Sequence, residues 1–294
     1  MSKYSIWVLE YAELDQYARG ALQYGAYEGS VRLPFCYVLI KSDEHISMVD
    51  VGYNHADYGG VLGKKFGISN WHSPRDVLEP FGLTPNQINT IFLTHAHFDH
   101  MGNLQDFPNA HFYIQQREIS EWIRAMTLPE EFKALNGATD PGDILNAVRA
   151  ACEGRLHYLD GDASDVIPGI DIHAAFDTHT YGSMWIHVRN DLSPESQDGW
   201  ILAGDLVYVY ENLGCEHPDQ VETGPYVPVG LATGSQTRLI ETSATMVRTT
   251  NGERRRVIPI HDRRLPDVFP SRKLQNGLTI TEICRADGQD SMVR

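Results

Sequence analysis

Three histidines and an aspartate lie within six consecutive residues, at His95, His97, Asp99 and His100. The short apolar run Ile91–Leu93 precedes them and predicts a buried strand that ends where the polar cluster begins. Side chains two residues apart on an extended segment point the same way, so His95 and His97 can converge on one ion. Asp99 and His100, beyond the bend, face the other way and can serve a second ion. We therefore expect a site for two metals.

The ligand types indicate which ions such a site would hold. Imidazole and carboxylate suit zinc, and also iron, manganese or cobalt. No cysteine lies near the cluster, although thiolates are the usual mark of a structural zinc site with every position filled. We expect two divalent cations as cofactors, with zinc preferred, in a catalytic site that keeps open positions.

The unbroken pattern His-x-His-x-Asp-His at residues 95–100 resembles the signature of the metallo-β-lactamase superfamily. Segments before and after it are similar to further segments of that family, in the same order. The resemblance implies an α/β fold, a four-layer αββα sandwich with a dinuclear metal site at one edge of the sheets. Length and composition agree with a single domain over residues 1–294, with two similar halves at approximately 1–153 and 154–294.

The resemblance assigns a role to each polar residue of these segments. Asp50, at the end of the predicted strand 46–51, would support the metal loop. The first metal would be held by His95, His97 and His179, the second by Asp99, His100 and His261, with Asp205 between them. Two positions depart from the family pattern: Asp177-Thr178 replaces the usual Pro-Gly before the third histidine, and Ile260 replaces the usual glycine before the last.

Hydrolysis is the reaction expected of this ligand set, because water between two dications loses a proton near neutral pH. Asp99 has a second expected role, passing a proton to the leaving oxygen. Tyr208, three residues after Asp205, resembles the tyrosine with which N-acyl-homoserine lactonases of the superfamily hydrogen-bond the lactone carbonyl. Alternatively, Tyr208 packs with Tyr210 in an aromatic surface. The expected function is the opening of a small lactone, an N-acyl-homoserine lactone (quorum quenching) or a related cyclic ester.

Other activities of the same superfamily remain alternatives: thioesterase, phosphotriesterase and cyclic-amide hydrolase. Their main support is the arginine cluster Arg254–Arg256 with Arg263 and Arg264, which could bind a substrate carboxylate or phosphate. Pairing of these arginines with surface acids is the preferred interpretation. A di-iron oxygen- or nitric-oxide-reducing protein typically carries glutamate where His97 stands, and a metal-free binding protein would have no reason to keep seven ligands in order.

Two long segments are candidates for substrate selection. Tyr11–Leu33 contains several tyrosines and glycines, and could form an aromatic wall, an oligomer contact or an ordinary surface loop. Glu211–Gly234, rich in proline, follows the segment that carries Asp205 and is the best candidate for a lid or pocket rim.

Composition narrows the partners and the compartment. The chain has 294 residues and a formal net charge of −15, which disfavours nucleic acid and the nuclease branches of the superfamily. The amino terminus lacks the features of a signal peptide, and no apolar run reaches membrane-spanning length. Four widely spaced cysteines predict reduced thiols in a cytoplasm. A small-molecule substrate is the expected partner, and a homodimer is left open.

Hydrophobic periodicity and helix-start signals predict alternating strands and helices, with helices covering two packed sheets. Strands are expected at Ser5–Leu9, Phe35–Ile40, Ile46–Val51, Thr90–Leu93, His111–Ile114, Leu156–Tyr158, Ile170–Phe176, Met184–Val188, Trp200–Ala203, Arg256–Ile260 and Leu278–Ile283. Helices are expected at Pro74–Phe81, Gln116–Met126, Pro129–Leu135, Pro141–Cys152 and Ser235–Thr249.

Overall fold

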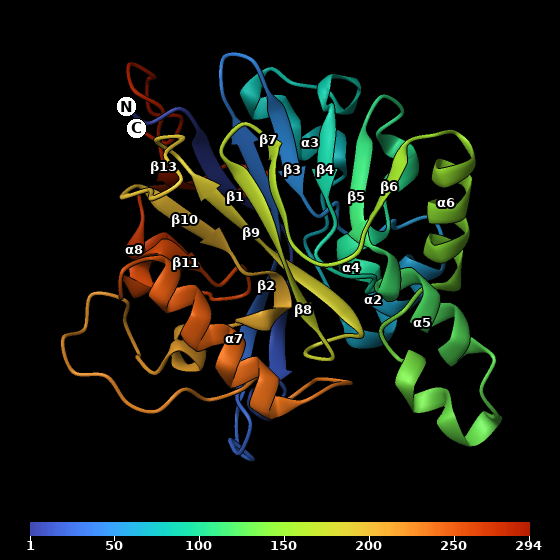
Figure 1. Cartoon of the computed structure of the whole chain (residues 1–294). Helices are drawn as coiled ribbons and strands as arrows, with labels where there is room; N and C mark the ends of the chain where they lie inside the picture. Colours follow the sequence, from blue (N-terminus) through green and yellow to red (C-terminus); the bar gives the residue numbers. More distant parts are fainter.

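The computed structural model describes residues 1–294 and contains two β-sheets that pack against each other (Figure 1). The larger sheet has eight strands in the order β12-β13-β1-β2-β3-β4-β5-β6. Their bounds are β1 Ser5–Ala18, β2 Ser30–Lys41, β3 Ile46–Val49, β4 Thr90–Phe92, β5 His111–Gln115, β6 Leu156–Leu159, β12 Ser271–Lys273 and β13 Thr279–Cys284. Strands β3 to β6 run parallel to one another, whereas the other neighbours in this sheet are antiparallel.

The smaller sheet has five strands in the order β11-β10-β9-β8-β7. Their bounds are β7 Ala163–Ile167, β8 Ile170–Phe176, β9 Gly182–Arg189, β10 Gly199–Leu202 and β11 Val257–Ile258. Seventy-four buried apolar residues form one continuous cluster that includes strands of both sheets, so the sheets share a core. The C-terminal strands β12 and β13 return to the larger sheet, and the two chain ends lie side by side (Figure 1).

Helices flank the two sheets, with α6 beside β6 and α7 over the smaller sheet (Figure 1). The α-helices are α1 Arg19–Leu22, α2 Tyr58–Phe66, α3 Pro74–Leu78, α4 Phe98–Met101, α5 Gln116–Met126, α6 Pro141–Cys152, α7 Gln236–Thr249 and α8 Leu265–Val268. The 3₁₀ segments are η1 Glu79–Phe81, η2 Pro85–Gln87, η3 Leu104–Asp106, η4 Glu130–Asn136, η5 Gly204–Leu206, η6 Tyr210–Leu213 and η7 Arg254–Arg256. The predicted αββα sandwich is confirmed. None of the helices is both long and apolar enough to cross a bilayer.

Strand direction brings the predicted site residues to one edge of the sandwich. In the larger sheet, β3 and β4 are parallel, so the segments that follow them leave at the same end. In the smaller sheet, β8 and β10 are both antiparallel to β9, and β11 is parallel to β10, so all three end together. A backbone hydrogen bond of 3.0 Å from Met184 N–H to the carbonyl of Thr94 joins the two sheets at this edge.

Most predicted elements are present, and the differences have local causes. Strands β1 and β2 extend well beyond their predicted ends into a long hairpin, where Arg32 pairs with Glu10 and Glu13 on the neighbouring strand. Helix α2 was not predicted because Gly59 and Gly60 in its first turn lower helix propensity. Strands β7 and β12 were also missed, since both are short, and β12 contains no apolar residue.

Candidate active site

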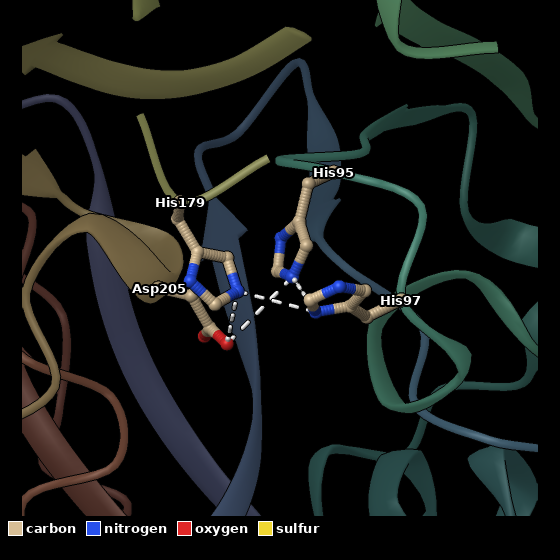
Figure 2. Close-up of side chains that lie close together, drawn as sticks. All are labelled: His95, His97, His179 and Asp205. Carbon is tan, nitrogen blue, oxygen red and sulfur yellow. Dashed lines mark hydrogen bonds and ion pairs between the residues drawn. The ribbon is translucent and has the colours of Figure 1, made fainter. Parts of the chain in front are cut away.

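Four side chains from three separate segments converge where the sheets meet (Figure 2). His97 Nδ1 lies 3.0 Å from His95 Nε2 and 3.1 Å from His179 Nε2. Asp205 Oδ2 lies 3.6 Å from His95 Nε2 and 3.3 Å from His179 Nε2. Ligands at zinc-like distances around a tetrahedral ion are separated by roughly 3.3 Å, so these four atoms could hold one metal.

A second cluster lies on the other side of Asp205. The other oxygen of this carboxylate, Oδ1, lies 3.2 Å from His100 Nε2 and 2.9 Å from His261 Nε2. Asp99 Oδ2 lies 3.4 Å from His100 Nε2. The Nε2 atom of His100 is buried and has no hydrogen-bond partner, as expected of a nitrogen that coordinates an ion. Asp205 therefore stands between two sets of donors, each of which fits a divalent metal.

The outward nitrogen of four imidazoles is held by an oxygen of the surrounding protein. The partners are Thr94 Oγ1 for His95 at 3.0 Å, Asp50 Oδ2 for His100 at 2.8 Å, the Leu231 carbonyl for His179 at 2.8 Å and the Pro34 carbonyl for His261 at 2.6 Å. Such contacts orient a metal-binding ring and select which nitrogen faces the ion.

Asp50 supports the metal loop, as the sequence predicts. Its Oδ1 accepts a hydrogen bond of 2.7 Å from the Thr94 backbone N–H, and its Oδ2 accepts one of 2.8 Å from the Thr94 hydroxyl. The residue adopts φ 62°, in the left-handed region that favours glycine. Its three side-chain contacts, to Thr94 and His100, hold it in this strained conformation.

Burial and charge suit the two clusters to bind cations. Burial and the nearby imidazole of His179 lower the pKa of His97 to about 3, so this ring is neutral, the form that binds metal. Burial opposes charge on His100, but the carboxylates of Asp205 and Asp99 outweigh it and raise its pKa well above the usual range. The carboxylates of the two clusters thus create a strongly negative field, which favours bound cations.

Glu118 is a residue beside the site that the sequence analysis missed. Its carboxylate is fully buried and joins both histidine-bearing loops. Oε1 accepts hydrogen bonds from the Ala96 N–H at 2.9 Å and the Trp122 indole at 2.7 Å. Oε2 accepts from the Thr180 hydroxyl at 2.8 Å and the Gly182 N–H at 2.6 Å. The carboxylate therefore holds the loop between His95 and His97 against the loop that carries His179.

A sequence signal for Glu118 existed. In α5 the buried positions include Trp122 and Ala125, four and seven residues after Glu118, so the glutamate occupies the apolar stripe of an amphipathic helix. A charged residue in such a stripe is almost never fully buried without partners. Gly182 is required beside it, since a Cβ there would lie only 2.7 Å from the Glu118 Cα.

A cavity of about 530 Å³ opens onto the two clusters. Twelve of its twenty lining residues are hydrophobic, which makes it an apolar pocket that ends at a polar centre. Its walls come from the β1–β2 hairpin, α2, η4 and the segment before α7, represented by Tyr17, Phe66, Leu135 and Leu231. Both segments considered for substrate selection thus contribute to the pocket, whereas Tyr24 and Tyr27 of the hairpin are exposed.

Tyr208 lines this cavity beside the second cluster. Its hydroxyl donates a hydrogen bond of 2.5 Å to Asp205 Oδ2, and its ring stacks on His261 with centroids 4.9 Å apart. Burial and the Asp205 carboxylate raise its pKa well above the usual range, so the phenol stays protonated. Tyr210 does not stack on Tyr208; it is buried in the core, with a hydroxyl that has no partner. The surface-packing alternative for Tyr208 is therefore wrong.

The arginine cluster faces away from the cavity. Arg255 pairs with Asp219 at 2.6 Å, Arg256 with Asp198 at 2.9 Å, and Arg264 with Glu211 at 2.5 Å. Arg254 donates a 2.8 Å hydrogen bond to the Leu213 carbonyl. No arginine lines the cavity, and its one lysine is Lys65. The preferred interpretation, pairing with nearby acids, holds for Arg255, Arg256 and Arg264, whereas Arg254 and Arg263 form no ion pair.

Comparison with known sequences identifies the family. A sequence profile of the metallo-beta-lactamase superfamily matches residues 30–219. This chain belongs to that superfamily. A curated relative, a probable metallo-hydrolase of Mycobacterium bovis, is 30% identical to this chain over 112 residues. These residues make up 35% of this chain and 36% of that protein. The chain thus matches about a third of the length of that relative.

Two further superfamily members are similar over more of the chain. The N-acyl homoserine lactonase AiiB of Agrobacterium fabrum is 23% identical over 196 residues, covering 63% of this chain and 67% of that protein. A solved N-acyl homoserine lactone hydrolase, with N-hexanoyl-L-homoserine bound at its catalytic metal centre, has a TM-score of 0.62 at 18% identity, over 98% of this chain and 99% of that chain. At this identity the structural likeness establishes a shared fold.

Proposed function

We propose that this protein is a dinuclear metal-dependent hydrolase that opens a small lactone with an apolar substituent, such as an N-acyl-homoserine lactone. The observation that carries the proposal is the apolar cavity of about 530 Å³ that ends at seven clustered histidine and aspartate side chains. A volume of this size suits a small molecule, and its apolar wall suits an acyl chain. The lactonase relatives support the same substrate class.

We assign the first metal to His95, His97 and His179, the second to Asp99, His100 and His261, and the bridging position to Asp205. Two divalent cations bound there, with zinc preferred, would supply a hydroxide nucleophile and polarise the attacked carbonyl. Tyr208 is protonated at the cavity wall, and its single O–H, which donates to Asp205 in the structure, would turn to the substrate carbonyl oxygen. Asp99, which also lines the cavity, would carry a proton to the leaving ring oxygen.

Thioesters with an anionic carrier fit the cavity less well than neutral substrates. Their recognition would use the arginine cluster, which is paired with acids outside the cavity. Lys65 alone offers a positive charge among the lining residues. A neutral cyclic ester matches this wall better than a dianionic substrate.

Proton release tests the reaction directly. Zinc- or cobalt-loaded protein is mixed with an N-acyl-homoserine lactone at a pH where spontaneous opening is slow, beside a chelator-treated sample. We expect acid release from the loaded protein only, with faster turnover of lactones that carry longer acyl chains. Protein with two bound metals that releases no acid from any lactone tested would overturn the proposal.

Replacing Tyr208 by phenylalanine tests its role on the carbonyl. We expect Tyr208→Phe to retain its metal and to lose about tenfold or more in kcat for lactone, the scale of one contact to a developing oxyanion. The matched control is Tyr210→Phe, which removes a buried hydroxyl that has no partner and lies outside the cavity. Equal kcat in the two variants would remove Tyr208 from the mechanism.

A further inference from the structure

Three aspartates, none of which belongs to the two clusters of the candidate active site, gather where the starts of α2 and α6 meet. Asp57 precedes α2, Asp140 precedes α6, and Asp143 lies in the first turn of α6. One carboxylate oxygen from each lies within 4.8 Å of the other two. Asp140 and Asp143 are 2% and 1% exposed, so two of these three acids are withdrawn from water.

These three carboxylates accept few hydrogen bonds from the surrounding protein. Asp57 accepts a hydrogen bond of 2.9 Å from the Gly59 N–H, and Asp140 accepts one of 2.7 Å from the Gly142 N–H, as helix N-caps do. Both oxygens of Asp143 are buried and have no hydrogen-bond partner. No lysine, arginine or histidine forms an ion pair with any of the three. An unpaired buried carboxylate that faces two others is costly, and a cation removes that cost.

We propose that Asp57, Asp140 and Asp143 form a second cation site, separate from the catalytic centre, which binds a calcium-class divalent ion. Carboxylate oxygens without nitrogen or sulfur are the ligands of hard cations. Calcium takes six to eight oxygen ligands in a flexible geometry that water can complete, whereas magnesium demands a near-ideal octahedron, so three carboxylates at the edge of solvent favour calcium. Asp57 is exposed, which leaves a path for the ion and for water ligands.

The site would join two walls of the substrate cavity. Asp57 caps the start of α2, and this helix ends with Lys65 and Phe66, which line the cavity. Asp140 follows Ala138, whose carbonyl accepts a 2.9 Å hydrogen bond from the Phe98 N–H, next to the metal-binding loop. An ion that links the starts of α2 and α6 would therefore hold both walls in place beside His97 and Asp99.

Acid–base linkage supports the same site. Burial and the neighbouring carboxylates of Asp140 and Asp57 raise the pKa of Asp143 to about 9. Burial, together with the carboxylates of Asp140 and Asp106, also raises the pKa of Asp57. No cationic side chain opposes the raised pKa of Asp57 or of Asp143. The unfolded chain loses the Asp143 proton near pH 4, so without the ion the folded state loses stability as pH rises from about 4 to about 9. Calcium should therefore stabilise the protein more at pH 8 than at pH 5.

Calorimetric titration of calcium into zinc-loaded protein at pH 8 is the test, with zinc content measured before and after. We expect a single calcium ion per chain, bound with micromolar to millimolar affinity, an increase in Tm and no loss of zinc. Asp143→Asn and Asp57→Asn should each weaken binding at least about tenfold, since each removes one of three charged ligands. Asp143→Asn should also raise Tm in the absence of calcium.

The controls separate this site from the catalytic metals and from misfolding. Asp43→Asn, which changes an exposed aspartate outside any ion pair, should bind calcium as the unaltered protein does. Asp57→Asn keeps an N-cap residue at an exposed position, so it provides the test if Asp143→Asn fails to fold. Absence of calcium binding to the zinc-loaded protein at millimolar calcium, or unchanged affinity in the aspartate variants, would overturn the proposal.

Discussion

Asp205→Asn should lose the second metal and reduce lactone turnover by at least about 100-fold. The two oxygens of this carboxylate face different clusters, with Oδ1 2.9 Å from His261 and Oδ2 3.3 Å from His179. An amide keeps the shape of the side chain but presents an N–H₂ group to one of the two clusters and removes the negative charge between them. Metal content per chain, measured beside kcat, gives the result.

His97→Ala provides an independent measurement on the first cluster. His97 Nδ1 lies within 3.1 Å of both other imidazole nitrogens there, so its removal opens that cluster. We expect loss of the first metal together with loss of turnover.

Asp43→Asn is the matched control for Asp205→Asn, because it makes the same change at an exposed aspartate outside any ion pair. Full metal content in both Asp205→Asn and His97→Ala would refute the ligand assignment.

Glu118→Gln should destabilise the protein by about 2–4 kcal/mol and weaken metal binding roughly tenfold. The carboxylate accepts four hydrogen bonds, two on each oxygen, from groups that are all donors. The amide of glutamine must point its own N–H₂ group at one of these pairs, which leaves a buried backbone N–H, of Ala96 or of Gly182, without an acceptor. Thermal unfolding and zinc titration measure the two effects separately.

Glu121→Gln is the matched control, because it makes the same change on the same helix at an exposed ion pair with Arg124. It should alter stability by no more than about 0.5 kcal/mol and leave metal affinity unchanged. If Glu118→Gln loses stability but binds zinc as tightly as Glu121→Gln, Glu118 supports the fold and does not position the metal loops.

The central cluster could be predicted from the sequence because its residues are neighbours. His95, His97, Asp99 and His100 follow one strand, and the alternation of an extended chain already separates them into two groups. Helices α5 and α6 were also predicted, because their hydrophobic periodicity and start residues lie within one continuous segment of the chain. The remote ligands His179 and His261 came from resemblance to the family, since no local pattern relates them to residue 95.

Tertiary structure alone decided the contacts between distant segments. Glu118 meets Ala96 and Gly182 only because α5 packs where the two sheets join, and a helical pattern cannot show which loops lie above its buried face. The same holds for Asp57 and Asp143, which are 86 residues apart in the numbering and each look like ordinary helix-start acids.

The sequence by itself thus determined the ligand types of the central cluster, because His95, His97, Asp99 and His100 follow one strand directly. The cavity wall, the outward pairing of Arg255 and Arg264 and the support from Glu118 depended on packing of both sheets and their helices. These contacts form because distant segments pack together to bury their apolar faces. The hydrophobic effect that drives this packing is non-directional, so the local spacing of residues does not show which segments will meet.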